Sequence, residues 1–466
     1  MTEAKTAESG AAALDLSAKN IVLTTAPVLF GLLLEQIIGM TDAIFLGRYG
    51  EIELGAAGLG SVVFFFFIAQ AFGYGVGAQS LMARAHGAGR DRETGEVFRQ
   101  GALFMLLGGI ASAGLCVCFA DAFMQMAAKS EAVQRAAADY VFWRGLGLPF
   151  AFLAVMFRSL FVAVLRTSVI TWCSIIMVGT NCTLNGLLIF GWGPVPAMGI
   201  AGAAIASSLA ELASLGYLFW AAKKGGVWTR CSISGPLTWD ASMQKRLFGL
   251  GKWLFLQEAV MVGTWFYFFA AVEHVSDRAL AASNVVRQLG SLLIFFVHAF
   301  GTTCGSMAAN LYGAGRQSEI NALCRRGFML SLGAMAPVAI VFLALPMPVL
   351  SLFTNVEAVA QAAKPAYFVM ISSYVITSAA YFYYFVAGAL GFAKPSFVIC
   401  AGASVVYAFY VALIVSLTEN LALVWTSDLV FGLAIGIGFL CLWRRTEWSL
   451  SRGDRAPVVP QGEGGC

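Results

Sequence analysis

Apolar residues in this chain form blocks of roughly twenty, separated by short stretches that hold most of the charges. About twenty apolar residues in a helix cross a bilayer, whereas strands of a membrane barrel alternate over ~10 residues. The blocks therefore predict an all-α polytopic membrane protein. We expect twelve transmembrane helices, at residues 21–47, 54–83, 100–120, 137–157, 168–190, 197–222, 250–272, 280–311, 327–353, 366–392, 396–417 and 420–443.

Composition agrees with this pattern. Of 466 residues, 59% are hydrophobic and only 12% are charged, against about 25% charged in soluble domains. The first twenty residues are polar and lack the apolar core of a cleavable signal peptide. The ten cysteines are scattered without paired or metal-ligand spacing, so we interpret them as small apolar residues.

The distribution of cationic residues predicts the orientation of the chain in the membrane. An even number of spans puts both termini on one side. The N-terminus, the loops on its side and the C-terminal tail hold 22 Lys and Arg, counting Arg158 and Arg166 in the loop after the fourth span. The opposite loops hold five. The positive-inside rule then places both termini in the cytoplasm, with the chain in the inner membrane.

A repeat divides the chain. "QSLMARAHGAGR" (79–90) is similar to "GSMAANLYGAGR" (305–316), 226 residues later. In each copy GAGR ends a second span, where Gly gives a tight exit from the helix and Arg meets the inner leaflet. Between the copies lies the longest loop. The domains expected are a cytoplasmic tail (1–20), an N-lobe (21–222), a cytoplasmic inter-lobe loop (223–249), a C-lobe (250–443) and a cytoplasmic tail (444–466).

Six spans in each lobe is an even number, so both lobes enter the membrane in the same direction. Such lobes are related by an axis along the membrane normal and enclose a central cleft. Two pseudo-symmetric six-helix lobes around a cleft suit alternating access, in which one lobe rocks against the other.

Four stretches carry a family resemblance. They are "TDAIFLGRYGEIELGAAGLG" (41–60), "GYGVGAQSLMARAHGAGR" (73–90), "NCTLNGLLIFGWGPVPAMGIAGAAIASSLAE" (181–211) and "VAGALGFAKPS" (386–396). In this order they resemble the bacterial multidrug and toxic compound extrusion (MATE) transporters. The resemblance implies two six-helix lobes and export of amphipathic, often cationic compounds in exchange for H⁺ or Na⁺.

Two acids interrupt the first span. Glu35 and Asp42 lie seven residues apart, about two helical turns, and share a face with Gly39. An ionised acid at mid-membrane costs at least ~2.5–3.5 kcal/mol on insertion scales, so such acids usually bind or move ions. The alternative is a structural acid near the interface. Asp42 matches the family's first-span acid, and the role of Glu35 stays open.

Two amides face the same region. Asn181 and Asn185 are four residues apart on the fifth span, where they could bond Asp42, coordinate a cation or join helices. Some MATE relatives have Asp where this chain has Asn185, and Thr where it has Ala203. A hard cation needs several oxygen ligands, so their loss favours H⁺ over Na⁺. Sodium remains possible at Asp42, Asn181 and Asn185, and no cofactor beyond the coupling ion is expected.

The C-lobe offers a second candidate site. Glu258 is the repeat counterpart of Glu35 and matches an acid in the seventh span of one MATE branch. That branch has a further acid in span ten, where this chain has Ala380. The ion site is thus incomplete by family standards. Glu258 could instead bind a cationic substrate, or pair with Arg287.

Aromatic side chains complete the candidates. Tyr381 and Tyr384 in span ten offer apolar and cation–π surface to a substrate, and His298 in span eight could titrate near neutral pH. The alternative for each is ordinary packing. We interpret Glu211 and Asp428, in spans six and twelve, as structural, with their roles left open, and Arg144 as an anchor at the periplasmic end.

Other classes fit less well. No nucleophile with a base, HExxH or phosphate-binding GK[ST] loop is present, so an enzyme or ATP-driven pump is not expected. A lipid-linked precursor flippase of the same architecture is the alternative, but such clefts are richer in cationic residues. We therefore predict a secondary active exporter of amphipathic, cationic small molecules. It would act as a monomer among membrane lipids and bind no nucleic acid.

Overall fold

The computed structural model describes residues 14–127, 130–194, 196–235, 238–354 and 357–451. Within these ranges, the side chains of residues 51, 126, 127, 277 and 447–451 are not described. Most of the two predicted tails, 1–20 and 444–466, therefore lies outside the described residues.

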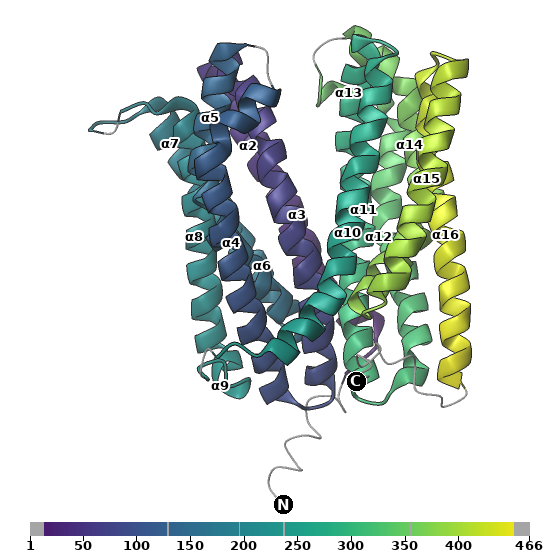
Figure 1. Ribbon diagram of the computed structural model, residues 1–466. Coiled ribbons are helices and arrows are strands. Elements are labelled where there is room, and N and C mark those ends of the chain that lie inside the picture. The colour runs from purple at the N-terminus through teal and green to yellow at the C-terminus, as the bar shows by residue number, and fades with distance from the viewer. Residues whose placement is uncertain (1–13, 128–129, 195, 236–237, 355–356, 452–466) are drawn as a thin grey trace, which may run out of the picture. The chain divides into compact units, whose positions relative to one another are not determined.

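Every regular element of the described residues is helical (Figure 1). The helices are α2 (Ala18–Tyr49), α3 (Glu51–Gly87), α4 (Asp91–Ala127), α5 (Glu131–Gly145), α6 (Leu148–Ala163), α7 (Ser168–Phe190), α8 (Gly199–Lys224), α9 (Val227–Arg230), α10 (Ala241–Glu273), α11 (Asp277–Gly313), η1 (Gln317–Glu319), α12 (Ile320–Ala344), α13 (Pro346–Ser351), α14 (Glu357–Ala389), α15 (Ala393–Leu417) and α16 (Leu421–Ser451).

The number of spans agrees with the sequence. Eleven helices of the described residues are long and apolar enough to cross a membrane, and α5 with α6 makes a twelfth. This pair is bent by 49° at its break. The predicted all-α fold with twelve spans is confirmed, but the fourth span is two helices rather than one over 137–157.

The break in the fourth span has a local cause. Pro149 lies in the first turn of α6, where a proline's fixed φ starts a helix but cannot continue one. Gly147, at the break, packs against α8 so closely that a Cβ there would meet the Ser208 hydroxyl at 2.5 Å. The ninth span ends for a similar reason. It was predicted to reach residue 353, but α12 stops at Ala344 before Pro346.

The repeated GAGR sequence forms the same turn twice. At the end of α3, the Arg90 amide donates to Ala85 O at 2.9 Å and Gly89 adopts φ 71°. After α11, the Arg316 amide donates to Leu311 O at 2.9 Å and Gly315 adopts φ 76°. Both are Schellman caps, whose left-handed residue is normally glycine. The predicted role of glycine as a tight helix exit is confirmed in both copies.

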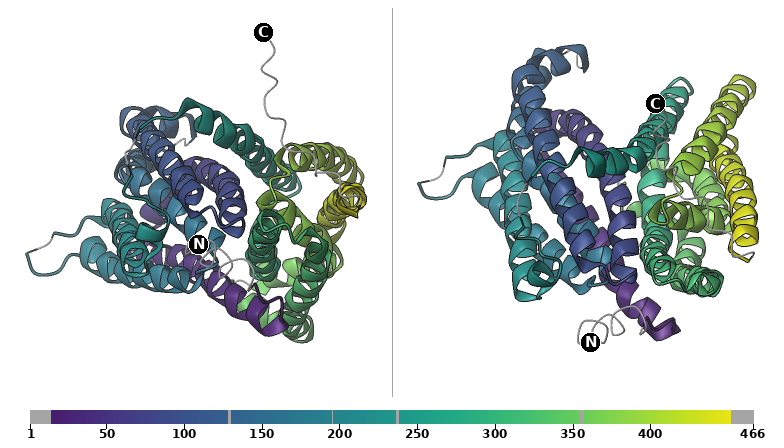
Figure 2. Two further views of the ribbon diagram at one scale, coloured as in Figure 1. Left: turned by 90° about the horizontal axis from the view of Figure 1, so that it is seen from below. Right: turned by 60° about the horizontal axis from the view of Figure 1, so that its bottom comes forward.

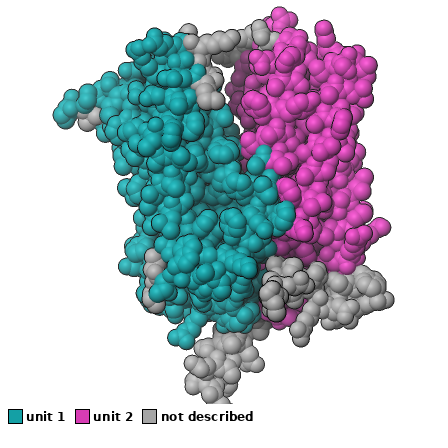
Figure 3. All heavy atoms as spheres, in the orientation of Figure 1, with its two compact units in different colours: residues 1–10, 19–259 teal, residues 11–18, 260–466 magenta. Residues whose placement is uncertain are grey.

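The chain divides into two compact units, coloured separately in Figure 3. The first contains Lys19–Ala259 and the second contains Val260–Cys466. Six spans precede the inter-lobe region and six follow it, and Figure 2 shows them from two further directions. The predicted loop 223–249 holds the short helix α9 and the start of α10.

The first half of α10 is fixed to the first unit. The Tyr74 hydroxyl of α3 donates to Gln244 Oε1 at 3.3 Å, and Gln244 Nε2 donates to Gln100 O of α4 at 2.8 Å. Gly77 comes so close to Gly251 that a Cβ on Gly77 would lie 3.3 Å from the Gly251 nitrogen. Just outside the span, Asp240 accepts from the Ser242 hydroxyl at 2.7 Å and from the Met243 and Ser242 amides, which lowers the pKa of its carboxyl and caps α10.

Candidate functional site

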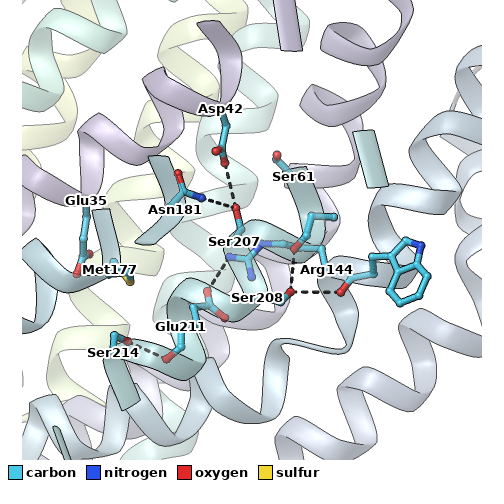
Figure 4. A network of polar contacts seen from close by, with 12 residues as sticks. Glu35, Asp42, Ser61, Arg144, Met177, Asn181, Ser207, Ser208, Glu211 and Ser214 are labelled. Atoms are coloured by element: carbon cyan, nitrogen blue, oxygen red, sulfur yellow. Dashed lines mark hydrogen bonds and ion pairs between the residues drawn. The ribbon is translucent and has the colours of Figure 1, made fainter. Parts of the chain in front are cut away.

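Asp42 is the centre of a buried polar network in the first unit. It lies seven residues before the end of α2 at Tyr49. Asn185 Nδ2 of α7 donates to Asp42 Oδ1 at 2.5 Å, and the Ser207 hydroxyl of α8 donates to Oδ2 at 3.2 Å. Three helices therefore meet at this carboxylate (Figure 4).

The two asparagines close the network. Asn185 Nδ2 also reaches Asn181 Oδ1 at 3.1 Å, and Asn181 Nδ2 donates to the Ser207 hydroxyl at 3.0 Å. Both amides are fully buried. The Asn185 Oδ1 atom has no hydrogen-bond partner, so this buried acceptor remains open to a proton donor or a water.

Small residues bring α7 and α8 together at this point. Gly202 lies so close to α7 that a Cβ there would meet Leu188 O at 2.6 Å. Ala203, Ala206 and Ala210 are buried along the same helix. The close approach of backbones through small residues is a common way to pack membrane helices. It places the Ser207 hydroxyl within reach of both Asn181 and Asp42.

A buried ion pair lies beside the network. Arg144 Nη2 and Glu211 Oε1 are 2.6 Å apart, with side chains only 10% and 12% exposed. The guanidinium also lies 3.6 Å from the centroid of the Phe64 ring. Arg144 acts electrostatically on Asp42 as well. It is therefore a partner of a buried acid, and not the interfacial anchor that we expected.

Glu35 belongs to a different contact. Its Oε1 pairs with Arg158 Nη1, and Arg158 Nη2 lies 3.5 Å from Met177 Sδ. Figure 4 shows Glu35 beside Met177 and away from Asp42. Arg158 lies inside α6, so its assignment to the loop after the fourth span was wrong. The predicted grouping of Glu35 with Asp42 does not occur in the structure.

Glu258 and Arg287 are described in separate units. Glu258 is partly exposed on α10 at the end of the first unit. In the second unit, the Arg287 guanidinium of α11 lies 5.7 Å from the Trp265 ring centroid and 5.4 Å from that of Phe269. Its Nε atom is buried without a hydrogen-bond partner. Arg287 is thus held by aromatic faces within its own unit.

The predicted aromatic and histidine candidates pack within the second unit. Tyr384 is 8% exposed, and its ring lies 6.0 Å from Phe439. Tyr381 is partly exposed and meets Tyr374 edge to face at 6.3 Å. His298 stacks on Phe385 with ring centroids 4.3 Å apart. Tyr381 and His298 keep partly exposed surfaces on α14 and α11, while Tyr384 is packed.

Two features of the site had no clear signal in the sequence. Ser207 was missed, although it lies one helical turn after Ala203, where a hydroxyl was sought and found absent. The pairing of Arg144 with Glu211 was missed because their spacing of 67 residues carries no local pattern. Among the described residues, no three His, Cys, Asp or Glu side chains lie close enough to hold a metal ion.

Twelve apolar spans, with a partly exposed carboxylate held by buried amides, are typical of a polytopic membrane protein of the secondary transporter class. The chain belongs to the MatE family, whose model matches residues 27–187 and 254–414. The two matched segments fall in the two halves that the repeat divides. The predicted MATE resemblance is thereby confirmed.

Relatives of this chain carry one name. The probable multidrug resistance protein NorM of Deinococcus radiodurans is 26% identical over 344 residues, 73% of this chain and 74% of the relative. The protein of the same name from Neisseria meningitidis serogroup B is 24% identical over 435 residues, 88% of this chain and 94% of the relative.

Solved structures share the fold. A multidrug resistance MATE family transporter of the MOP superfamily, in its outward-facing conformation, superposes with a TM-score of 0.82 at 19% identity. The alignment covers 93% of this chain and 97% of that one. A MOP superfamily transporter from Pyrococcus furiosus gives a TM-score of 0.83 at 18% identity, covering 93% and 96%.

Proposed function

We propose that this protein is a secondary active exporter that expels amphipathic, cationic small molecules in exchange for a cation, by alternating access. Membership of the MatE family and relatives named as probable multidrug resistance proteins support this proposal. We place it in the inner membrane with both termini in the cytoplasm. A lipid-linked precursor flippase is not favoured, since no relative reported above carries such a name.

One observation carries the ion-coupling role. The Asp42 carboxylate is held by the uncharged donors Asn185 and Ser207 rather than by a guanidinium of its own. A membrane acid without a paired cation can take up and release a small cation as water reaches it from one side or the other. Asp42, Asn181, Asn185 and Ser207 therefore form the proposed coupling site.

The same geometry favours H⁺ over Na⁺. Both Asp42 oxygens face N–H or O–H donors, which occupy positions that a sodium ion would need. Hard cations bind through several oxygens, so sodium would require Asn185 to turn its oxygen inward. The fixed charge of Arg144, which already acts on Asp42, opposes a second cation. A proton needs neither change.

Tyr381 and His298 in the second unit, and separately Glu258 in the first unit, are candidates for substrate contact. Glu258 offers a negative charge on α10, and Tyr381 offers a ring face on α14. Arg287 is already held by Trp265 and Phe269, so we assign it no direct substrate contact. Glu35 is neutralised by Arg158, and we propose a structural role for it.

Transport by the purified protein in proteoliposomes tests the proposal. Vesicles are loaded with a fluorescent lipophilic cation, and a pH gradient or a sodium gradient is imposed separately. We expect the pH gradient alone to drive transport, and Asp42→Asn to abolish it. Asp139→Asn, an exposed acid on α5, is the matched control and should transport like the wild type.

Three results would each overturn a part of the proposal. Transport driven by sodium alone at equal pH would reject the proton preference. Normal coupling in Asp42→Asn would reject the site. If neither gradient moves any cationic probe although the protein is folded, export of cationic compounds is itself wrong.

A further inference from the structure

Four acids with described partners lie inside the apolar segments predicted to span the membrane, and they fall into two kinds. Glu35 and Glu211 each pair with an arginine, Arg158 and Arg144. Asp42 in the first unit and Asp428 in the second are instead held by uncharged donors. Paired acids are neutralised in place, whereas an unpaired acid in a membrane is a candidate for reversible ion binding.

Asp428 lies among tyrosines of three helices in the second unit. It belongs to α16, and its Oδ2 lies 3.5 Å from the Tyr374 hydroxyl of α14. The Tyr407 hydroxyl of α15 also acts on this carboxylate. Tyr374 and Tyr407 are 7% and 3% exposed. The carboxylate is thus flanked by hydroxyl groups that can donate hydrogen bonds to it without neutralising its charge.

Helix packing fixes this position. One turn beyond Asp428, a Cβ on Gly432 would lie 2.4 Å from Thr377 of α14. One turn further, a Cβ on Gly436 would lie 3.2 Å from the Ala380 Cβ. Asp428, Gly432 and Gly436 therefore form one face of α16 that rests on α14. Asp428 therefore lies on the face of α16 that meets α14.

The other groups around Asp428 carry no compensating ion pair. On α14, Tyr374 donates to it and Tyr381 acts on it electrostatically. On α15, Tyr407 acts on it, and Cys400 acts on Tyr381. On α11, Arg287 acts on Tyr374 rather than on Asp428. Among the described residues, no Lys or Arg forms a salt bridge with this carboxylate.

The two unpaired acids occupy matching depths in their own helices. Asp42 lies seven residues before the end of α2, and Asp428 lies seven residues after the start of α16. At 1.5 Å per residue, each is about 10 Å from its helix end. With twelve spans and cytoplasmic termini, both helix ends face the same side of the membrane.

We propose that Asp428, with the hydroxyls of Tyr374 and Tyr407, is a second proton-binding site carried by the C-terminal unit. Each transport cycle would then exchange two protons, one at Asp42 and one at Asp428. Each step moves one proton between water and a carboxylate oxygen, with no other bond made or broken. The inference rests on the proton-coupled antiport proposed above.

Infrared difference spectroscopy tests proton binding without transport. Wild type, Asp428→Asn and Asp42→Asn are titrated over pH in detergent, and the C=O stretch of protonated carboxyl groups is followed. We expect Asp428→Asn to remove one titrating component that Asp42→Asn retains. Tyr407→Phe should shift the titration of that component. Tyr410→Phe should not, because this α15 hydroxyl bonds Thr426 at 2.8 Å.

Coupling stoichiometry tests the transport consequence. In proteoliposomes, the substrate gradient that just balances an imposed pH gradient gives the number of protons exchanged per substrate. We expect two for the wild type and for Tyr410→Phe, and one for Asp428→Asn.

The outcomes separate this inference from the proposed function. An unchanged infrared titration in Asp428→Asn overturns the second site, even if the wild type is proton-driven. A wild-type stoichiometry of one, or an unchanged stoichiometry in Asp428→Asn, overturns its coupling role. A wild type that no pH gradient drives rejects proton antiport itself, while the titration still reports whether Asp428 binds a proton.

Discussion

Individual side chains decide how the Asp42 network behaves. Ser207 is the one hydroxyl that links the carboxylate of Asp42 with the amide of Asn181 in the described network. Neighbouring Ser208 points elsewhere, donating to Ala204 O and Trp143 O. A substitution at Ser207 therefore perturbs the network, and the same substitution at Ser208 is its control.

Ser207→Ala removes a donor to Asp42 and leaves the Asn181 amide without its acceptor. Loss of this hydrogen bond destabilises the ionised form of the Asp42 carboxyl by about 1 kcal/mol. We expect the pH of half-maximal transport to rise by up to about one unit. The measurement is the pH profile of substrate flux in proteoliposomes. Ser208→Ala should leave the profile unchanged, and equal shifts in both variants would contradict the assignment.

We expect that breaking the buried Arg144–Glu211 pair lowers the stability of the protein strongly. Removing one partner of a buried pair typically costs about 3–5 kcal/mol, because the other charge stays buried and unpaired. Arg144→Gln should therefore lower the melting temperature of the detergent-solubilised protein clearly. Arg135, which pairs with Glu131 on the same helix, provides the control, with side chains 77% and 76% exposed.

An exposed pair contributes only about 0–1 kcal/mol. Arg135→Gln should therefore melt close to the wild type. Similar melting temperatures for Arg144→Gln and Arg135→Gln would show that the buried pair does not stabilise the first unit.

Helix contacts in this protein depend on where small residues fall. On α4, a Cβ at Gly109 would lie 2.7 Å from Pro149 Cα, at the start of α6. A Cβ added at Gly114, on the same helix, would meet no neighbouring atom within 4 Å. The glycine at 109 is thus required by the contact with the broken fourth span, and the glycine at 114 is not.

Gly109→Ala should destabilise the protein by about 1–3 kcal/mol, since backbone atoms must move apart to admit the methyl group. Gly114→Ala should be neutral or stabilising by up to about 1 kcal/mol, because alanine is the better helix former. Thermal unfolding of both variants in detergent checks this. A stable Gly109→Ala would mean that α4 and α6 do not meet as closely as described.

The whole chain carries a charge asymmetry that predicts its topology. Moving Arg158 from a loop into α6 lowers the cytoplasmic count only from 22 to 21, against five on the other side. The positive-inside rule then still places both termini in the cytoplasm. A green fluorescent protein fused at either end should fluoresce, and an alkaline phosphatase fused there should be inactive. An active phosphatase at either end would reverse the assignment.

Periodicity and local chemistry account for most of what could be predicted of the fold. Long apolar blocks gave the span count, and the GAGR repeat gave two helix exits with the same cap. The break after Gly145 was missed, because Gly147 and Pro149 lie inside an apolar run, and such a run predicts one continuous span. For the candidate site, helical spacing put Asn181 and Asn185 on one face, and the structure places Asn185 on Asp42 and Asn181 beside it.

The sequence by itself determined twelve membrane spans, the internal repeat and the presence of acids inside apolar helices. It did so because spanning length and the cost of burying charge are local properties of the chain. Only the tertiary structure decided which acid meets an arginine. Glu35 with Arg158 and Glu211 with Arg144 are joined across helices far apart in sequence, and Asp42 and Asp428 are left with uncharged donors, because packing between helices chooses partners that no spacing along one helix reveals.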